Sequence, residues 1–374
     1  MDLAEQLDHL SEDVRRDLER SHFDRPRFER LAARLRAGQP IDNRVHGAVD
    51  PPGAGDVRAL PAPGSAEAAH CEELGLAALA RGEVALVVLA GGMATRMGGV
   101  VKALAEALPG RTFLDLRLAE VDAMTRRVGR PLPLWLMTSS TTDAELRRVL
   151  GDRLDGEQLA TFPQQLSLRL TARGELLLDA SGRPGLHAPG HGDLVDALRD
   201  SGLLTAFLAR GGRVVMVANV DNLGATLDPL VVGFHLEHGR PVTCEVVDKV
   251  GTDRGGIPVR LDGRPVILEE FRLPRGFDPA SVRVFNTNTF LFDARALAGL
   301  AFDWTFFAVT KQVDGAPTVQ FERLLGEVTS HLDTVFLHVP RNGAESRFLP
   351  VKDPEELAAR RAEIAAVLHA RGIQ

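Results

Sequence analysis

Short, wholly apolar runs alternate with amphipathic stretches through the middle of the chain. The apolar runs occupy 84–89, 134–137 and 214–217, and runs of this length fit strands that are buried on both faces of a parallel sheet. Apolar residues recur at helical spacing in the intervals 143–150 and 193–210. This alternation predicts an α/β fold with a doubly wound, mixed but mostly parallel sheet.

The N-terminal region has a different pattern. Within 2–38, apolar residues recur at helical spacing and charged residues fill the other faces, which indicates amphipathic helices. The stretch 50–64 is rich in proline and glycine turns. Ser65 can then cap a helix that runs to Arg81. We therefore expect residues 1–64 to form a helical arm and linker.

The second half of the chain contains shorter β-rich pieces. Runs at 242–247, 257–261 and 282–291 are separated by glycine and proline turns and look antiparallel. We expect them to form a small β-rich subdomain within a main domain that spans 65–340. The final segment, 341–374, is expected to add a strand and a capped helix that complete the site, with no further domain after them.

Composition and charge narrow the class of protein. Hydrophobic residues make up 44% of the chain, charged residues 25%, and the net charge is −7, which is unlike a general nucleic-acid binder. No apolar run approaches the ~20 residues that span a bilayer, and the N-terminus lacks the features of a signal peptide. The two cysteines, Cys71 and Cys244, suit a reducing compartment. We expect a cytoplasmic protein with neither nucleic-acid nor membrane partners.

A glycine-rich loop follows the first apolar run. Residues 89–98 read LAGGMATRMG, and Lys102 comes shortly after. Glycines allow the backbone to approach a ligand closely, and successive N–H groups can then point at phosphate oxygens. The spacing matches neither the P-loop nor the dinucleotide-binding pattern, and a simple tight turn between strand and helix is the alternative. Arg96 and Lys102 favour phosphate, so the loop predicts a nucleoside triphosphate site.

Asp221 is the best candidate for a metal ligand. It comes just after the apolar run 214–217, and ligands of doubly wound sheets bind at the carboxyl ends of the strands. A carboxylate there can bind Mg²⁺ together with phosphate oxygens. The alternative is that Asp221 caps the turn that follows.

Two histidines and an aspartate lie close together in the sequence. His187, His191 and Asp193 have a spacing that would suit a metal site on a helix. Pro189 and Gly190 lie between the histidines, so the segment is a loop and the helical argument fails. A loop that holds a planar base or a phosphate is the better interpretation.

Further polar residues interrupt or flank the β-rich pieces. The segment 285–289 reads FNTNT within an otherwise apolar strand, and asparagine side chains both donate and accept, which suits sugar hydroxyls. Simple pairing across the sheet is the alternative. Lys249, Lys311 and Lys352 each lie beside a predicted strand, where a lysine is often only solvated.

Taken in order, several segments resemble one enzyme family. The matching segments are 90–98 with Lys102, 162–164, 188–193, 219–225, 245–249, 253–256, 285–288, 311–315, 320–322 and 347–352. They resemble the UTP–glucose-1-phosphate uridylyltransferases and their relatives, the UDP-sugar and UDP-N-acetylhexosamine pyrophosphorylases. The resemblance implies a Rossmann-like nucleotidyltransferase fold and transfer of a nucleotidyl group from UTP to a sugar 1-phosphate. Pyrophosphate would be the second product and Mg²⁺ the cofactor.

The resemblance also implies roles for individual residues. The residues expected to bind UTP are Ala90, Gly91, Gly92, Gln164 and Gly190. The cationic catalytic residues expected at the phosphates are Lys102, Arg96, Lys352 and Lys249. The residues expected at the sugar phosphate are His191, Asn219, Gly256, Asn286 and Asn288. Asp221 would bind the metal.

The sequence departs from the family pattern at a few positions. Ala94 stands where the family has a second loop glycine, and Val101 stands where a proline usually precedes the lysine. Val220 and Thr289 replace a commoner serine and asparagine. The β-helical C-terminal domain of many eukaryotic members is not expected here, so we expect a monomer or a small homo-oligomer.

Three hypotheses about function follow. The first is a UDP-sugar pyrophosphorylase that uses glucose 1-phosphate. The second is an enzyme that uses another sugar phosphate, such as galactose 1-phosphate or N-acetylglucosamine 1-phosphate, or a broad range of them. The third is a non-catalytic protein that binds nucleotide sugars.

Overall fold

A mixed sheet of eight strands lies at the centre of the computed structural model, which describes residues 2–38, 42–94, 98–251, 253–313 and 315–373. In spatial order the strands are β2 (Val57–Ala59), β20 (Thr334–His338), β14 (Val242–Asp248), β17 (Val284–Asp293), β13 (Val214–Asn219), β3 (Val84–Leu89), β8 (Leu134–Thr138) and β9 (Leu159–Pro163). Neighbouring strands run parallel except where β17 pairs antiparallel with β14 and β13. This confirms the predicted α/β class.

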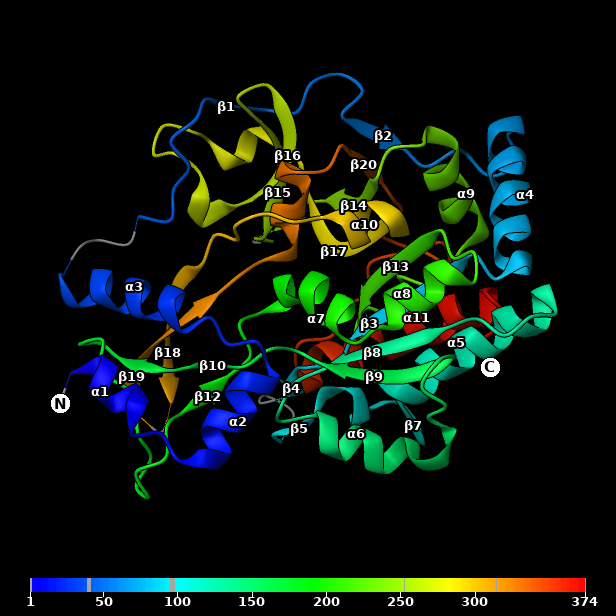
Figure 1. Cartoon of the computed structure of the whole chain (residues 1–374). Helices are drawn as coiled ribbons and strands as arrows, with labels where there is room; N and C mark the ends of the chain where they lie inside the picture. The colour runs from blue at the N-terminus through cyan, green and yellow to red at the C-terminus, as the bar shows by residue number, and fades with distance from the viewer. Residues whose placement is uncertain (1, 39–41, 95–97, 252, 314, 374) are drawn as a thin grey trace.

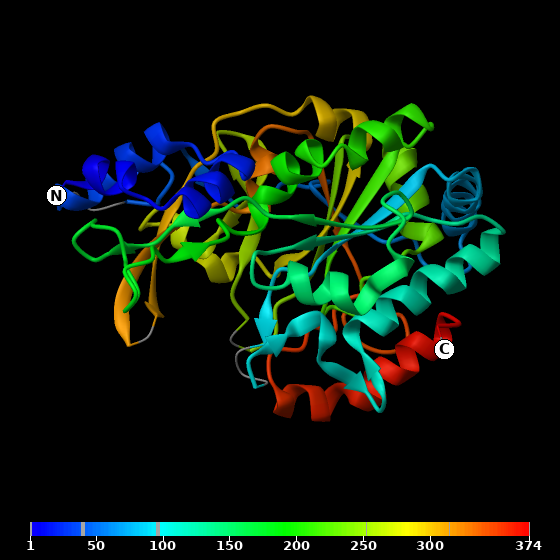
Figure 2. The same ribbon diagram turned by 60° about the horizontal axis from the view of Figure 1, so that its bottom comes forward.

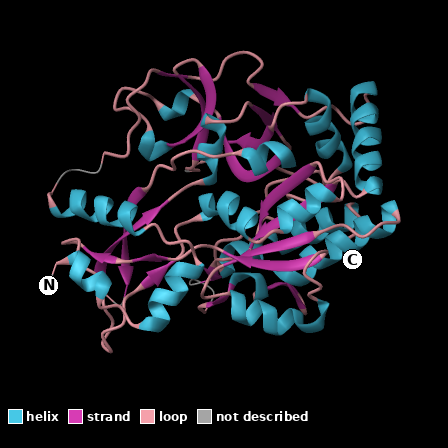
Figure 3. Cartoon of the chain, viewed as in Figure 1, coloured by secondary structure: helices cyan, strands magenta, loops and turns pink. Residues whose placement is uncertain are grey.

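Helices cover both faces of this sheet (Figures 1 and 3). Successive side chains of β3 point to opposite faces of the sheet, so Leu86 and Val88 lie in one apolar cluster and Ala85 and Val87 lie in another. Both faces are therefore apolar and need to be covered. The helices that pack into the first cluster are α4 (Ala66–Arg81), α5 (Phe113–Val128), α6 (Asp143–Leu150), α9 (Pro229–His238) and α11 (Pro354–Ala370). Those of the second are α7 (Leu194–Asp200), α8 (Leu203–Ala209) and α10 (Ala294–Gly299).

Several predicted elements have the expected bounds. The Ser65 side chain accepts a hydrogen bond from the Ala68 N–H at the start of α4, and Gly82 ends that helix in the left-handed conformation. The single helix predicted over 193–210 is wrong, because it breaks into α7 and α8 at Gly202, whose φ is +78°.

The β-rich pieces predicted as one subdomain belong to different sheets. The runs at 242–247 and 282–291 are β14 and β17 of the central sheet, where their apolar side chains are buried. Only the run at 257–261 lies in a small antiparallel sheet, which consists of β1 (Val49–Asp50), β15 (Gly256–Leu261) and β16 (Arg264–Glu269). The prediction therefore had the strands right and their grouping wrong.

The N-terminal helices pack on a second group of small antiparallel sheets. Leu7, Val14 and Phe28 share an apolar cluster with Leu170 and Phe321, and Figure 1 shows the helices beside these strands. The helices are α1 (Leu3–Asp8), α2 (Glu12–Arg20) and α3 (Arg25–Arg36). The strands are β10 (Ser167–Leu168) with β12 (Leu186–His187), and β11 (Leu170–Thr171) with β19 (Ala316–Glu322) and β18 (Phe307–Val313).

The two ends of the chain lie at opposite ends of the molecule (Figures 1 and 2). The strand predicted within 341–374 is absent from its described residues, where 341–353 run as a loop before α11. Asn222 fixes this loop, because its side chain accepts from the Leu349 N–H at 2.7 Å and donates to the Arg347 carbonyl at 3.1 Å. Side-chain bonds to Asn222 thus replace the strand ladder that the sequence predicted.

Two short hairpins follow β3. They consist of β4 (Met93–Ala94) with β5 (Val100–Val101), and β6 (Glu106–Leu108) with β7 (Arg111–Thr112). The first hairpin closes the glycine-rich loop and leads directly to Lys102. Within the described part of the chain, no helix is both long enough and apolar enough to cross a membrane.

Candidate active site

Lys102 and Asp221 meet at the carboxyl edge of the central sheet. The Lys102 Nζ donates to the Asp221 Oδ2 at 2.6 Å, and the side chains are 20% and 14% exposed. The contact arises because β3 and β13 are parallel neighbours, so the loops that follow them emerge side by side. The sequence predicted both residues and their common edge, and the structure places them in contact.

The glycine-rich loop is held against the neighbouring strand. The Ala90 N–H donates to the Met137 carbonyl at 2.8 Å, and the Ser139 hydroxyl donates to the Gly91 carbonyl at 2.9 Å. A β-carbon on Gly91 would lie 2.6 Å from the Gln164 Oε1, so glycine permits the close approach of Gln164. Arg96 lies outside the described residues, and its catalytic role stays a prediction.

Gln164 and Gly190, which are predicted to read the base, are in contact. Gln164 directly follows β9, and its Nε2 donates to the Gly190 carbonyl at 2.8 Å although the two residues lie far apart in sequence. The Gln164 side chain is 9% exposed. An amide fixed in this way presents both a donor and an acceptor, which is the functionality that a uracil edge requires.

His191 is a neutral hydrogen-bond donor in this site. Its Nδ1 accepts from the Leu325 N–H at 3.1 Å, so the proton of the neutral ring resides on Nε2. Burial lowers the pKa of His191 to about 4, against a smaller opposing effect of Glu322. At neutral pH His191 can therefore donate to a phosphate oxygen but contributes no positive charge.

The three predicted asparagines gather where β13 ends and β17 begins. The Asn288 Nδ2 donates to the Asn219 Oδ1 at 3.0 Å, and the Asn288 N–H donates to the Asn286 Oδ1 at 2.7 Å. Asn288 has a φ of +58°, and the pairing of β17 with β14 shifts register next to it, a bulge that redirects the side chain. Among the described residues no partner reaches the buried Asn288 Oδ1, which can accept from a ligand hydroxyl.

Gly256 lies opposite a glutamate that the sequence analysis missed. Gly256 pairs with Glu269 across the β15–β16 hairpin, and a β-carbon on Gly256 would lie 2.9 Å from the Glu269 Oε1. Burial, and then the neighbouring Glu270, raise the pKa of Glu269 to about 7. Adjacent glutamates at the end of an apolar run were the available signal for this residue.

The raised pKa of Glu269 predicts a pH-dependent stability. The folded protein keeps a proton on Glu269 that the unfolded chain releases near pH 4.5, so this residue's contribution to stability declines as pH rises from about 4.5 to about 7. Glu269→Gln should remove this decline. The melting temperature of the variant minus that of the unmodified protein should therefore be larger at pH 8 than at pH 5. Glu73→Gln, at an exposed position on α4, should show no such change, and identical pH profiles for Glu269→Gln and the unmodified protein would contradict the assignment.

The structure gives Lys249 and Lys352 neighbours other than those of Lys102 and Asp221. The Lys249 Nζ lies 3.4 Å from the Glu270 Oε1 and donates to the Pro279 carbonyl at 3.2 Å. Lys352 is exposed just before α11, near Asp253. Neither lysine forms a hydrogen bond with Lys102 or Asp221 among the described residues. The role of Lys249 and Lys352 at the phosphates stays a prediction.

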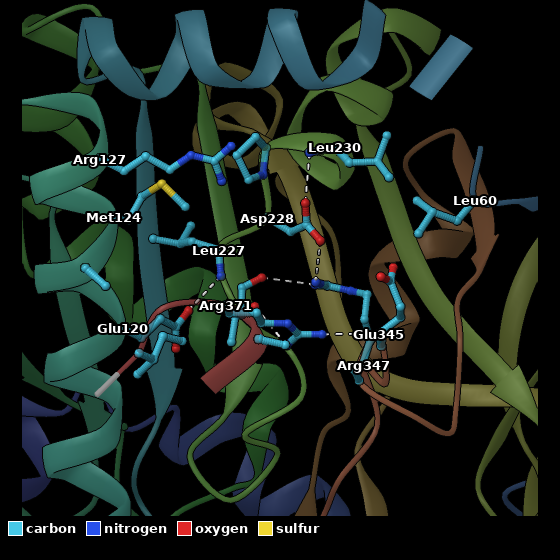
Figure 4. Close-up of a pocket in the computed structure, with 16 residues that line it drawn as sticks. Leu60, Glu120, Met124, Arg127, Leu227, Asp228, Leu230, Glu345, Arg347 and Arg371 are labelled. Carbon is cyan, nitrogen blue, oxygen red and sulfur yellow. Dashed lines mark hydrogen bonds and ion pairs between the residues drawn. The ribbon is translucent and has the colours of Figure 1, made fainter. Parts of the chain in front are cut away.

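A cavity of about 230 Å³ is lined by side chains of α5, of the segment 226–230 and of the loop before α11 (Figure 4). Arg347, which is 1% exposed, lies between Glu245 at 2.6 Å and Asp228 at 3.5 Å, and the Arg371 guanidinium donates to the Gly224 carbonyl at 2.6 Å. The lining contains none of the predicted substrate-binding residues. These buried charges therefore support the segment that follows Asp221, because Arg347 donates to the Thr226 carbonyl as well. Arg347 begins the matching segment 347–352, whereas nothing in the sequence indicated Arg371.

Arg117, on α5, supports the loop that carries Asp221. Its guanidinium donates to the Asn219 carbonyl at 2.8 Å and to the Asn222 carbonyl at 2.6 Å, while Glu120 neutralises it at 2.7 Å. Arg117 is fully buried. Because these two carbonyls lie on either side of Asp221, Arg117 fixes the backbone that carries the carboxylate.

Comparison with known proteins now identifies the family. The family model for UTP–glucose-1-phosphate uridylyltransferase matches residues 40–371. The chain belongs to this uridylyltransferase family. Relatives include the UTP–glucose-1-phosphate uridylyltransferase of Hordeum vulgare, which is 31% identical over 292 residues, and that of Saccharomyces cerevisiae, 29% identical over 312 residues. These alignments cover 74% and 77% of this chain, and the chain spans 61% of the length of each relative.

Solved structures of uridylyltransferases share the fold. The UDP-N-acetylglucosamine pyrophosphorylase of Trypanosoma brucei has a TM-score of 0.77 at 21% identity, over 96% of this chain and 80% of that one. A mutant UDP-glucose pyrophosphorylase of Leishmania major in complex with UDP-glucose has a TM-score of 0.69 at 24% identity. The match covers 88% of this chain and 74% of that one. The likeness confirms the architecture of a mostly parallel sheet with small antiparallel sheets.

Two departures from the uridylyltransferase pattern have a structural explanation. Ala94 is 5% exposed and Val101 is 1% exposed, and both lie in the β4–β5 hairpin, where Met93 pairs with Val101. Val101 belongs to the main apolar cluster of the domain. Val101 therefore contributes to the core, and Ala94 is buried in the hairpin beside it.

Asp221 meets the chemical requirements of the Mg²⁺ site that the uridylyltransferase family implies. Among the described residues, no three His, Cys, Asp or Glu side chains gather in a way that could hold a metal ion. Mg²⁺ typically takes one or two carboxylates and completes its shell with phosphate oxygens and water. A single carboxylate at the edge where phosphates are expected fits this pattern.

Proposed function

We propose that this chain transfers the uridylyl group of UTP to a sugar 1-phosphate, releasing pyrophosphate and forming a UDP-sugar. The supporting observation is that the Lys102–Asp221 contact and the Gln164–Gly190 pair lie at the same edge of the central sheet. The first pair follows β3 and β13, and Gln164 follows β9, two strands away from β3. One pair supplies charges for a triphosphate and the other supplies an amide for a base. Membership of the uridylyltransferase family supports the same reaction.

The proposed chemistry needs positioning more than acid–base catalysis. The phosphate of the sugar 1-phosphate is already an anion and can attack the α-phosphorus without a general base. The residues then align the two phosphates and offset their charges. Lys102 would contact the triphosphate, and the His191 Nε2–H would donate to the sugar phosphate. Mg²⁺ held by Asp221 would neutralise charge at the α-phosphate.

Glucose 1-phosphate is the sugar substrate we propose. The test is a pyrophosphate-release assay with UTP and glucose 1-phosphate, galactose 1-phosphate or N-acetylglucosamine 1-phosphate in turn. The highest kcat/KM with glucose 1-phosphate supports the proposal. Preference for another sugar would keep the reaction and change the substrate, whereas UTP binding without pyrophosphate release would favour a non-catalytic binding protein.

Asn288 provides a more specific prediction about the sugar. Asn288→Gly removes the side chain but tolerates the φ of +58°, so it tests the amide without adding backbone strain. We expect KM for the sugar 1-phosphate to rise about tenfold, equivalent to ~1.4 kcal/mol and typical of one hydrogen bond, with little change in KM for UTP. Equal effects on both substrates would contradict a role at the sugar.

We further propose a cytoplasmic location and a monomer or small homo-oligomer. Cys71 and Cys244 are buried free thiols, which suits a reducing compartment. Light scattering coupled to size-exclusion chromatography would determine the oligomeric state.

A further inference from the structure

We propose that Arg323 is a positioning residue for the base-binding part of the UTP site, an inference that rests on the proposed function. Arg323 directly follows β19. Its N–H donates to the Pro189 carbonyl at 2.7 Å, and its carbonyl accepts from the Gly192 N–H at 3.1 Å. The backbone of Arg323 therefore holds the loop that carries Gly190 from both sides.

The glycines of this loop permit the close approach. A β-carbon on Gly190 would lie 2.7 Å from the Arg323 carbonyl oxygen, and one on Gly192 would lie 2.8 Å from the Arg323 carbonyl carbon. Gly190 also has a φ of +95°, which side-chain-bearing residues rarely adopt. The shape of the loop is thus adapted to the Arg323 backbone.

The side chain of Arg323 binds Gln165, the residue next to Gln164, and Asp193. Its Nε donates to the Asp193 Oδ1 at 2.9 Å, and its Nη2 donates to the Gln165 Oε1 at 3.0 Å. The Gln165 N–H in turn donates to the Asp193 Oδ2 at 2.5 Å. Because Gln165 adjoins Gln164, one guanidinium fixes the segment that carries the base-reading amide.

The environment of Arg323 makes it rigid. The side chain is 2% exposed, forms a second ion pair with Asp196 at 2.5 Å, and lies over the rings of Trp304 and Phe306 at 5.1 and 5.7 Å. A planar guanidinium presents five donors in a fixed fork, whereas an ammonium presents three donors on a flexible stem. Among the described residues, its hydrogen bonds reach neither the glycine-rich loop nor Asp221, so its effect should fall on base recognition.

The test compares UTP with a probe that has no base. Binding of UTP and of inorganic tripolyphosphate is measured by calorimetry for the unmodified protein, Arg323→Lys and Arg323→Met. We expect Arg323→Met to weaken UTP binding at least ~10-fold, as expected for lost charge-assisted hydrogen bonds, and to leave tripolyphosphate binding within about twofold. Arg323→Lys keeps the positive charge but not the forked geometry, so its affinity for UTP should lie between those of the unmodified protein and Arg323→Met. It also keeps the test possible if Arg323→Met fails to fold.

A destabilised variant elsewhere separates positioning from general loss of structure. Phe234 is 2% exposed on α9, which packs on α4 at the other end of the molecule (Figure 1). Phe234→Leu should lower the melting temperature without changing the ratio of the two affinities.

Each outcome of the binding experiment is decisive. The proposal is overturned if Arg323→Lys weakens the binding of UTP and of tripolyphosphate equally, or weakens neither. It is also overturned if the unmodified protein binds UTP no more tightly than tripolyphosphate. If the unmodified protein binds UTP selectively but releases no pyrophosphate with any sugar 1-phosphate, the proposed function fails. The inference about Arg323 is still decided by the binding ratios.

Discussion

Replacing Lys102 by methionine is expected to lower kcat for UDP-sugar formation by about 10²–10³-fold, the effect of removing one preorganised group that stabilises transition-state charge. The Lys102 ammonium is 20% exposed and lies 2.6 Å from the Asp221 carboxylate. It is therefore held at the edge where the triphosphate is proposed to bind. The loss should appear in steady-state rates with saturating UTP and glucose 1-phosphate.

Two further variants make the Lys102 result interpretable. Lys102→Arg retains the charge but changes its position, so we expect it to recover only part of the rate. Arg148→Met removes a positive charge from an exposed side chain on α6 and should leave the rate unchanged. A folded Lys102→Met protein with the rate of the unmodified protein would exclude the role at the phosphates.

Replacing Asp221 by asparagine is expected to lower the rate by a similar ~10²-fold or more and to abolish its response to added Mg²⁺. Asparagine has the size of aspartate and can still accept a hydrogen bond from Lys102, but it lacks the negative charge that binds a divalent cation. Initial rates measured over a titration with MgCl₂ would show the change.

A carboxylate at the surface is the matched control for Asp221. Asp333 precedes β20, and its side chain is 76% exposed, so Asp333→Asn changes the same charge without touching the sheet edge. Its magnesium titration should coincide with that of the unmodified protein. If the magnesium titration of Asp221→Asn also coincided with that of the unmodified protein, the metal would have to be bound elsewhere.

The elements predicted correctly are those whose signals are local. The apolar run at 84–89 and the cap at Ser65 depend on neighbouring residues only, and both have the expected bounds. The shared edge of Lys102 and Asp221 followed from a general rule for parallel sheets. That rule needs only the order of strands and loops, which the sequence displays directly.

The features that could not be predicted depend on contacts between distant parts of the chain. An antiparallel pattern at 242–247 does not reveal whether the strand joins a small sheet or the central one, because either environment buries it. Glu269 acquires its raised pKa only from the fold around the hairpin. Arg323 binds a carboxylate more than 100 positions away, and a single arginine carries no periodicity that would indicate such a contact. Arg347 lies in a segment that matches the family, but its buried pair with Glu245 depends on the fold in the same way.

The reversed direction of β17 has a consequence for how this scaffold tolerates change. Its start lies at the functional edge, where Asn286 and Asn288 are found, and its end at Asp293 pairs with Val214 at the opposite edge. Residues inserted just before β17 would therefore enter the proposed substrate site. At the far end Asp293 both ends β17 and caps α10, and Ala294 is fully buried, so nothing can be inserted there without breaking the cap. For a designer of altered sugar specificity, the connection from β16 into β17 is the place to vary length.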